Sequence, residues 1–312
     1  MKLAISWGDP AGIGPEVLLR ALAAKPCEAV VVGDAARLKE AAERLRLPAP
    51  AEVLSPAEVE VPPELLFAGR TSAEGGRSAA AAVRVAADLV ASGQAAALVT
   101  APLNKESLAL AGERHPGHTE LLAEHFDAPG TRMMLQGGGL RVVLVTTHVA
   151  LREVPRLLTV EGIRETCVSA AAGLRGLGIA RPRLALAALN PHASDGGRFG
   201  NEETRLLKPA VAQARLAGVE VEGPFPADTL FAQAARPESR FDAVVALYHD
   251  QGLIPVKLAS FGQATNVTLG LPIVRTSPDH GTAFDIVGQG KASPESFLVA
   301  LDVARELARQ RD

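Results

Sequence analysis

The sequence predicts an α/β protein, and three observations support this prediction. The chain has 312 residues, a length that suits two domains or one large α/β unit. Its composition, 47% apolar and 21% charged, is typical of a globular protein. Short apolar runs alternate with longer amphipathic segments along most of the chain, as expected for successive βαβ units.

The strand candidates are short runs of apolar or β-branched residues, and some, such as residues 142–145, are apolar throughout. Runs of this kind suit a parallel sheet that is covered on both faces. The predicted strands are residues 3–6, 29–32, 96–99, 142–146, 184–188, 243–247 and 265–269. The predicted helices between them include residues 16–24, 77–92, 160–174, 202–217 and 293–308.

No linker of distinct composition separates the predicted domains. The glycine cluster at residues 137–139 is the best candidate for a crossover between two lobes. A tight hairpin turn is an equally good interpretation of the same three glycines.

Charge and cysteine content limit the expected partners. The formal net charge is −3 and the basic residues are scattered, so we expect neither a nucleic-acid partner nor a membrane partner. Cys27 and Cys167 form no CxxC pair, which excludes a disulfide framework and favours a reducing compartment. No apolar run reaches the roughly 18 residues of a membrane span. We therefore expect a cytoplasmic protein.

Three histidines share one kind of position in the predicted fold. His148, His192 and His249 each lie at or just past the carboxyl end of an apolar strand, the edge where open α/β sheets bind ligands. Any one of them alone is explained by a core histidine with its hydrogen bonds satisfied. Together they predict a shared metal site whose fourth position stays open for a substrate oxygen, as a Lewis acid requires.

A second set of polar residues suggests an anion site. The GHTE sequence places His118 and Thr119 just ahead of a helix, where backbone N–H groups and the helix dipole favour an anion. With Lys257, Asn266 and Arg275 they would hold a phosphate or a carboxylate. A helix cap or an ordinary surface charge explains each of them singly.

Two glycine-rich segments could approach a nucleotide. In SWGDPAGIGPE the spacing of Gly8, Gly12 and Gly14 is not GxGxxG, and Asp9 adds a negative charge. The second segment, DHGTAFDIVGQG at residues 279–290, has a small-residue turn that could approach an adenosine. A dinucleotide would therefore not bind here in the Rossmann manner.

Six motifs extend in order over nearly the whole chain: GDPAGIGPE, TAPLNK, GHTE, NPHASDGG, YHDQGLIPVK and VRTSPDHGTAFDI. Together they closely resemble the 4-hydroxythreonine-4-phosphate dehydrogenase family of pyridoxal phosphate biosynthesis. The resemblance implies a two-lobed α/β/α fold of the isocitrate/isopropylmalate-dehydrogenase type, with the active cleft between the lobes. Residues 1–130 and 277–312 would form the first lobe, with the termini and the cofactor loop. Residues 131–276 would form the second, with the metal and the contacts of a homodimer that shares its active site.

The resemblance also implies roles for individual residues. One divalent metal ion (Zn, Co or Mg) would be held by His148, His192 and His249. The substrate would be bound by His118, Thr119, Lys257, Asn266 and Arg275. The cofactor, NAD or NADP, would lie against His280, Gly281, Thr282 and Asp285.

The implied reaction is metal-dependent NAD(P) oxidation of 4-phosphooxy-L-threonine at C3, followed by decarboxylation to 3-amino-2-oxopropyl phosphate. Either Lys257 or Asp250 would accept the proton, directly or through water. The chain departs from the family pattern at Ser194 and Asp195, where Gly-Glu is common, and at Gln289, where Lys is common. The second departure leaves the choice between NAD and NADP open.

Two other functions remain compatible with these residues, and a third is disfavoured. A related dehydrogenase of threonate or erythronate 4-phosphate would share the metal, the phosphate site and the cofactor loop. A metal phosphohydrolase would use the metal and the phosphate site without a nicotinamide cofactor. A binding protein with a structural zinc is disfavoured, because no fourth Cys or His shares the strand-end position.

Overall fold

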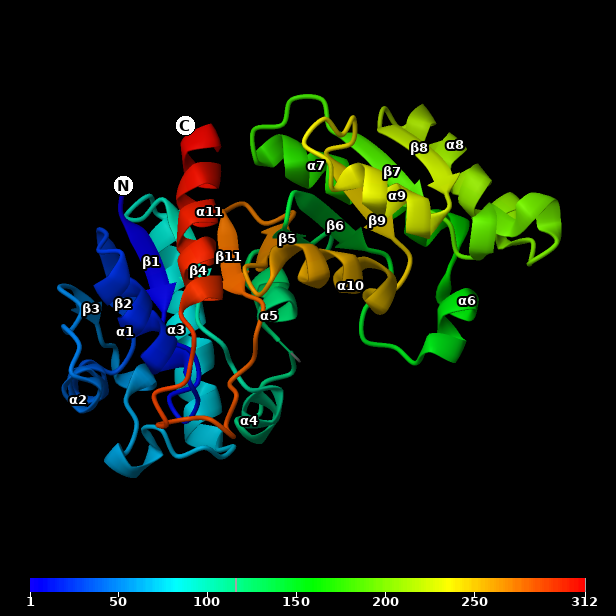
Figure 1. Ribbon diagram of the computed structural model, residues 1–312. Helices are drawn as coiled ribbons and strands as arrows, with labels where there is room; N and C mark the ends of the chain where they lie inside the picture. The colour runs from blue at the N-terminus through cyan, green and yellow to red at the C-terminus, as the bar shows by residue number, and fades with distance from the viewer. Residues whose placement is uncertain (116, 312) are drawn as a thin grey trace. The chain divides into compact units, whose positions relative to one another are not determined.

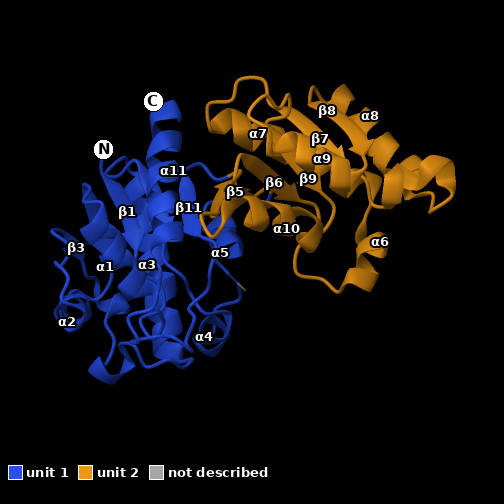
Figure 2. Ribbon diagram, in the orientation of Figure 1, with its two compact units in different colours: residues 1–129, 271–312 blue, residues 130–270 orange. Residues whose placement is uncertain are grey.

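The computed structural model describes residues 1–115 and 117–311, and its sheet and helices confirm the predicted α/β class (Figure 1). The chain divides into two compact units (Figure 2). Unit 1 comprises Met1–Pro129 and Leu271–Asp312, and unit 2 comprises Gly130–Gly270. Among the described residues, no helix combines the length and the apolar character needed to cross a membrane.

The strands of unit 1 are all parallel, in the order β3-β2-β1-β4-β11. Their bounds are Leu3–Ser6 (β1), Ala29–Val32 (β2), Val53–Leu54 (β3), Ala97–Thr100 (β4) and Arg275–Pro278 (β11). β1 and β4 are buried along their whole length, as expected for a sheet with helices on both faces.

The helices of unit 1 begin where the sequence offers a cap. Ser72 accepts a hydrogen bond from the N–H of Gly75 at the start of α3, and Asn104 caps α4 in the same way. Gly76 lets α3 approach α4 closely, because a Cβ there would lie 2.0 Å from the carbonyl oxygen of Ser107. The helices are Gly14–Ala24 (α1), Ala35–Leu45 (α2), Ala73–Ala91 (α3), Lys105–Leu110 (α4), His118–His125 (α5) and Glu295–Arg311 (α11), with short 3-10 turns at Ala57–Val59 and Pro63–Leu65.

The strands of unit 2 follow the order β10-β5-β6-β9-β7-β8. β5 is antiparallel to both β10 and β6, and the remaining pairs are parallel, so the sheet of this unit is mixed, and the apolar run at residues 142–145 pairs in parallel with β9 as expected. The bounds are Arg132–Gly137 (β5), Leu140–Leu144 (β6), Arg183–Ala187 (β7), Glu220–Phe225 (β8), Ala243–Ala246 (β9) and Thr265–Leu269 (β10).

The glycine cluster at residues 137–139 forms the hairpin turn between β5 and β6. Gly138 and Gly139 adopt φ values of +57° and +79°, the left-handed region that two-residue hairpin turns require. The hairpin interpretation is therefore correct and the crossover interpretation is wrong. The chain passes between the units near residues 129–130 and 270–271 instead.

The helices of unit 2 cover a core formed by β5, β6, β7 and β9. α10 lies directly on this sheet at Gly252, where a Cβ would be 2.6 Å from Cγ1 of Val142. The helices are Val154–Leu157 (α6), Val160–Gly176 (α7), Lys208–Leu216 (α8), Ala227–Ala234 (α9) and His249–Ser260 (α10). Shorter turns occur at Leu151–Glu153, Pro191–Gly197 (η4) and Glu203–Leu207 (η5, a single π-helical turn).

The division of the chain differs from the predicted lobes, mainly at the second boundary. Residues 271–276 belong to unit 1, whereas the prediction assigned them to the second lobe. The reason is that β11 pairs in parallel with β4, with Arg275 opposite Leu98. Arg275 is thereby part of unit 1. The first boundary differs by one residue.

Candidate active site

The three strand-end histidines lie on neighbouring strands of unit 2. β9 pairs in parallel with both β6 and β7, so the carboxyl ends of the three strands meet at one edge of the sheet. His148 follows β6, His192 follows β7, and His249 follows β9 as the first residue of α10. The turns that carry the three side chains therefore share the edge where such sheets bind ligands.

Two polar side chains hold these strand ends together. Thr146 donates its hydroxyl to the carbonyl oxygen of Leu247, at 2.7 Å, which ties the end of β6 to the end of β9. Gln251 donates to the carbonyl oxygen of Ala188 and accepts from the N–H of Leu247, each at 2.7 Å. α10 thereby links the ends of β7 and β9. The sequence reasoning missed Gln251, although it lies inside the YHDQG motif.

His148 and His249 face each other across this edge. Their ring centroids are 5.6 Å apart, with the rings tilted by 45°. Two imidazoles on one tetrahedral zinc, with Zn–N bonds of about 2.1 Å, have centroids roughly 5 Å apart, so this pair fits two ligands of one ion. His249 Nδ1 is hydrogen-bonded to Asp250 Oδ1 at 2.7 Å, which leaves Nε2 as the nitrogen that a metal would take. Both histidines line a pocket of about 490 Å³.

His192 is not assembled with this pair in the structure. Within residues 1–115 and 117–311, no three His, Cys, Asp or Glu side chains are grouped so that they could hold a metal ion. His192 lies in the η4 turn, where residues 192–196 all have positive φ values between +44° and +72°. The structure thus brings together two of the three predicted ligands, with the third exposed on an irregular turn at the same edge.

Glu203 anchors the η4 turn, and the sequence reasoning missed it. Its side chain is 1% exposed and accepts hydrogen bonds from the N–H groups of Leu189 and Asn190, at 3.0 and 2.8 Å. It also accepts from the Asn190 side chain and from the Ser194 hydroxyl. Burial works to raise the pKa of Glu203, but these hydrogen bonds outweigh it and hold the pKa below its usual range. Glu203 is therefore ionised, and both of its carboxylate oxygens accept hydrogen bonds.

Unit 1 carries a buried cation at the start of β11. Arg275 is 3% exposed, and its Nε and Nη2 atoms donate to the Thr100 hydroxyl oxygen at 3.2 and 2.5 Å. Burial lowers the pKa of Arg275 to about 9, so the guanidinium is still charged at neutral pH. The negative charge of Glu120 acts against this lowering, and a buried guanidinium remains a strong hydrogen-bond donor for an anionic ligand.

His118 lies close enough to Arg275 for the two to interact, at the first turn of α5. Burial, and then the positive charge of Arg275, lowers the pKa of His118 well below its usual value, so the imidazole is neutral. Its Nε2 atom is buried and finds no hydrogen-bond partner among the described residues. A buried polar atom of this kind calls for a partner, and a substrate oxygen would supply one. Thr119 is the next residue of the same turn.

The other two predicted substrate ligands belong to unit 2. Lys257 is exposed on α10, two turns beyond Asp250 on the same helix. Asn266 is partly buried on β10, opposite Leu135 of β5. The predicted substrate-binding residues are thus divided between the units, with His118, Thr119 and Arg275 in unit 1.

The predicted cofactor loop, residues 279–290, is supported by the N-terminal glycine turn. The N–H of Ile13 donates to the carbonyl oxygen of Thr282 at 3.0 Å, and a Cβ at Gly12 would lie 2.8 Å from the same oxygen. Asp9 is fully buried and accepts a hydrogen bond from the N–H of Ala11. Its carboxylate therefore stabilises the turn itself, and it is not exposed to a nucleotide. Gly281 has open space where a side chain would be.

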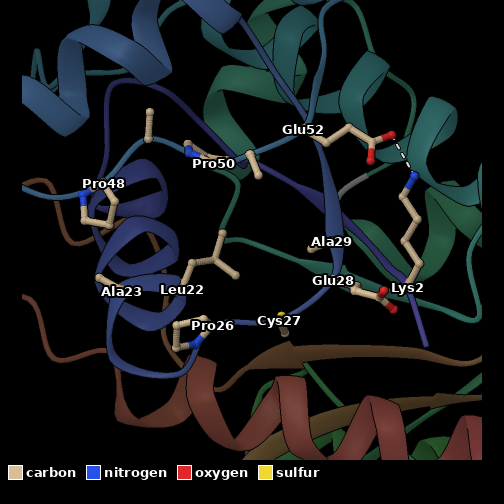
Figure 3. Close-up of a pocket in the computed structure, with 12 residues that line it drawn as sticks. Lys2, Leu22, Ala23, Pro26, Cys27, Glu28, Ala29, Pro48, Pro50 and Glu52 are labelled. Carbon is tan, nitrogen blue, oxygen red and sulfur yellow. Dashed lines mark hydrogen bonds and ion pairs between the residues drawn. The ribbon is translucent and has the colours of Figure 1, made fainter.

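A larger pocket, of about 830 Å³, lies at another place in unit 1 (Figure 3). It is lined mainly by proline and alanine side chains, and none of the predicted site residues contributes to it. Its two acidic residues are paired, Glu52 with Lys2 at 2.6 Å and Glu28 with the N-terminal ammonium at 2.9 Å. The pocket therefore lacks the chemistry predicted for the active site.

Solved structures that share 30% or more of their residues with this chain include dehydrogenases. The crystal structure of 4-hydroxythreonine-4-phosphate dehydrogenase from Klebsiella pneumoniae matches with a TM-score of 0.89 and 41% identity, over 98% of this chain and 99% of that chain. The 4-hydroxythreonine-4-phosphate dehydrogenase of Beijerinckia indica is 44% identical, over 98% of this chain and 94% of that protein. The D-threonate 4-phosphate dehydrogenase of Salmonella typhimurium is also 44% identical, over 98% of both chains.

The family model described as pyridoxal phosphate biosynthetic protein PdxA matches residues 25–304. The chain belongs to this family, and the resemblance inferred from the six motifs is confirmed.

Proposed function

We propose that the chain is a metal-dependent NAD(P) dehydrogenase that oxidises 4-phosphooxy-L-threonine at C3 and decarboxylates the product to 3-amino-2-oxopropyl phosphate, in pyridoxal 5'-phosphate biosynthesis. The observation that supports this most directly is the buried Arg275 beside the neutral His118, whose Nε2 atom has no hydrogen-bond partner among the described residues, in a chain of the PdxA family. A charged guanidinium and an imidazole at one place suit the oxygens of a phosphorylated substrate.

Substrate binding is assigned to residues of both units. Arg275 supplies charge-assisted hydrogen bonds, and His118 and Thr119 supply neutral ones from the first turn of α5. Lys257 and Asn266 complete the set from unit 2. The compartment proposed for this reaction is the cytoplasm.

One divalent metal ion (Zn, Co or Mg) would be held by His148, His192 and His249. When bound it would act as a Lewis acid toward the substrate hydroxyl. The facing pair of His148 and His249 fits this role, while the exposed His192 would join the pair on metal binding. Asp250 orients the imidazole of His249 through Nδ1.

Proton transfer is assigned to a residue of α10. Lys257 is one candidate for the group that accepts the proton from the substrate hydroxyl, and Asp250 is hydrogen-bonded to His249. Asp250, directly or through water, remains the alternative. The Lys257→Ala variant should lose turnover at all pH values, whereas an Asp250→Asn variant should chiefly weaken the metal site.

The nicotinamide cofactor, NAD or NADP, would bind at His280, Gly281, Thr282 and Asp285. The loop that carries them is fixed by protein contacts: Gln289 donates to the carbonyl oxygen of Asp285 at 2.7 Å. Lys291 in turn donates to the Gln289 side chain at 2.9 Å, which places one cation beside position 289.

A second copy of the chain is the partner that we propose for α10. Ile254, Leu258 and Phe261 form an apolar stripe along and just past this helix, and they are 61%, 72% and 85% exposed. Exposed stripes of this size on a helix are typical of protein interfaces. A homodimer that shares its active site would cover the stripe. Sedimentation should show a dimer that Leu258→Glu converts to monomer, and a monomeric wild-type protein would contradict it.

The test of the proposed activity is a substrate panel followed by NAD(P)H absorbance. We expect 4-phosphooxy-L-threonine to be oxidised in preference to D-threonate 4-phosphate and erythronate 4-phosphate. The equal identity to the Salmonella typhimurium relative makes D-threonate 4-phosphate the second candidate substrate. Release of inorganic phosphate without any change in absorbance would indicate a phosphohydrolase and refute the proposal.

A further inference from the structure

The turn that carries His192 depends on one carboxylate. Glu203 begins the η5 turn and receives four hydrogen bonds, three of them from Leu189 and Asn190 at the exit of β7. The fourth comes from the Ser194 hydroxyl, two residues beyond His192. The donors therefore lie on both sides of His192 in the sequence.

The backbone of this turn needs such an anchor. His192, Ala193, Ser194 and Asp195 are four successive residues other than glycine with positive φ, a conformation that L-residues adopt only when the surroundings impose it. Ser194 has φ +72°, and its side chain is 3% exposed. The Ser194 hydroxyl gives the turn a direct contact with the Glu203 carboxylate.

We propose that Glu203 is a positioning residue, which holds the backbone from Leu189 to Ser194 so that the His192 imidazole can join His148 and His249 on a divalent metal. This inference rests on the metal site of the proposed function. Glu203 itself is buried and both of its oxygens already accept hydrogen bonds. It acts on the backbone of the turn and touches neither metal nor substrate.

The first measurement needs no metal: hydrogen exchange of the backbone amides at residues 189, 190 and 192–195. In Glu203→Gln one oxygen becomes an NH2 group, which faces N–H donors instead of accepting from them. We expect the amides of Leu189 and Asn190 to exchange at least about tenfold faster. The matched control is Glu220→Gln, at an exposed glutamate of unit 2, which should leave their exchange unchanged.

The second measurement is Co²⁺ affinity by calorimetry. Loss of a group that orients a metal ligand typically weakens metal binding 10- to 100-fold, and we expect this for Glu203→Gln. Ser194→Ala keeps the backbone donors and removes only the hydroxyl, so its affinity should fall several-fold without loss of the fold. In both variants kcat should fall, while the KM for NAD(P) should stay as in the wild type.

The outcomes separate this inference from the proposed function. Faster exchange with unchanged Co²⁺ affinity in both variants would overturn the positioning role. Unchanged exchange in Glu203→Gln would overturn the anchoring itself. A wild-type protein that binds no Co²⁺ would instead overturn the metal site, and the exchange result would still decide whether Glu203 holds the turn.

Discussion

The two units differ in how completely they prepare their parts of the candidate site. In unit 1, Arg275 and His118 come from a strand and a helix, and their charge states are set by burial. In unit 2, His148 and His249 face each other, but His192 stands apart on an irregular turn. The described residues of the candidate anion site are already close together, whereas the candidate metal site would need a bound metal ion to bring His192 to the other two histidines.

The largest effect is expected when a predicted metal ligand of unit 2 is removed. His249→Ala removes one of the two histidines already facing each other, and because three ligands act as a unit we expect most of the metal to be lost. Turnover should fall by more than about 100-fold, beyond the usual cost of losing a group that merely orients a ligand. Metal analysis beside steady-state rates measures this, with His125→Ala, at a surface ion pair, as control. Full metal content with full turnover would remove His249 from the site.

The next effect tests the unit 1 site. Arg275→Ala should lower kcat/KM for a phosphorylated substrate by about 10- to 100-fold, since a charge-assisted hydrogen bond contributes roughly 1.5 to 3 kcal/mol. A substrate analogue without the phosphate should be used poorly by both proteins and no worse by the variant. Arg77→Ala, at an exposed arginine, controls for the change of charge. Equal losses on both substrates would show that Arg275 does not bind phosphate.

A smaller effect tests whether the nicotinamide cofactor lies against the loop at residues 279–290. A Cβ at Gly281 would have open space around it within 4 Å, so we expect Gly281→Val to leave the thermal midpoint nearly unchanged. If the nicotinamide cofactor lies against this residue, its KM should rise by about tenfold, the effect of roughly 1.4 kcal/mol. Gly176→Ala, at another glycine with open space, is the control. Unchanged cofactor kinetics would place the cofactor elsewhere.

The smallest effect concerns pH. The folded protein keeps His118 neutral because its pKa lies well below the usual 6.5, whereas the unfolded chain takes up a proton below about 6.5. This contribution to stability is therefore present above that pH and is lost as the pH falls toward the folded pKa. Urea unfolding at pH 7.5 and 5.0 should show a smaller decrease for His118→Gln, which stays neutral, than for the wild type. An identical decrease in both proteins would indicate that His118 is protonated in the folded state.

The strands that the sequence predicted are those with uniformly apolar or β-branched runs. β1, β2 and β10 have the predicted bounds, and β4, β6, β7 and β9 are shifted by one or two residues. Four strands were missed. β3 has only two residues, and β5, β8 and β11 each contain charged or polar residues, such as Arg132, Glu222 and Arg275. These segments form strands because they pair with strands that are distant in the sequence, and a local sequence pattern does not predict such pairing.

The candidate site was predictable to a similar extent. The strand-end positions of His148 and His249 follow from the apolar runs before them, and the structure places the two side chains together. The left-handed turn at His192 was not evident from the sequence, because two of its residues, Ala193 and Ser194, are not types that favour positive φ. Glu203 was hidden inside a segment with an ordinary helical pattern, and only the fold shows that its side chain turns inward to the η4 turn.

Gly252 gives α10 a role beyond covering the sheet. A Cβ at this position would lie 2.6 to 3.0 Å from side-chain atoms of Val142, Leu144 and Ala246, so the helix backbone itself is in contact with three strand side chains. His249 is the first residue of the same helix, about 4.5 Å away along its axis. Any larger residue at 252 would push the helix outward and carry His249 with it. The range of residues that evolution can accept at this glycine is thus limited by the position of an imidazole one helical turn away.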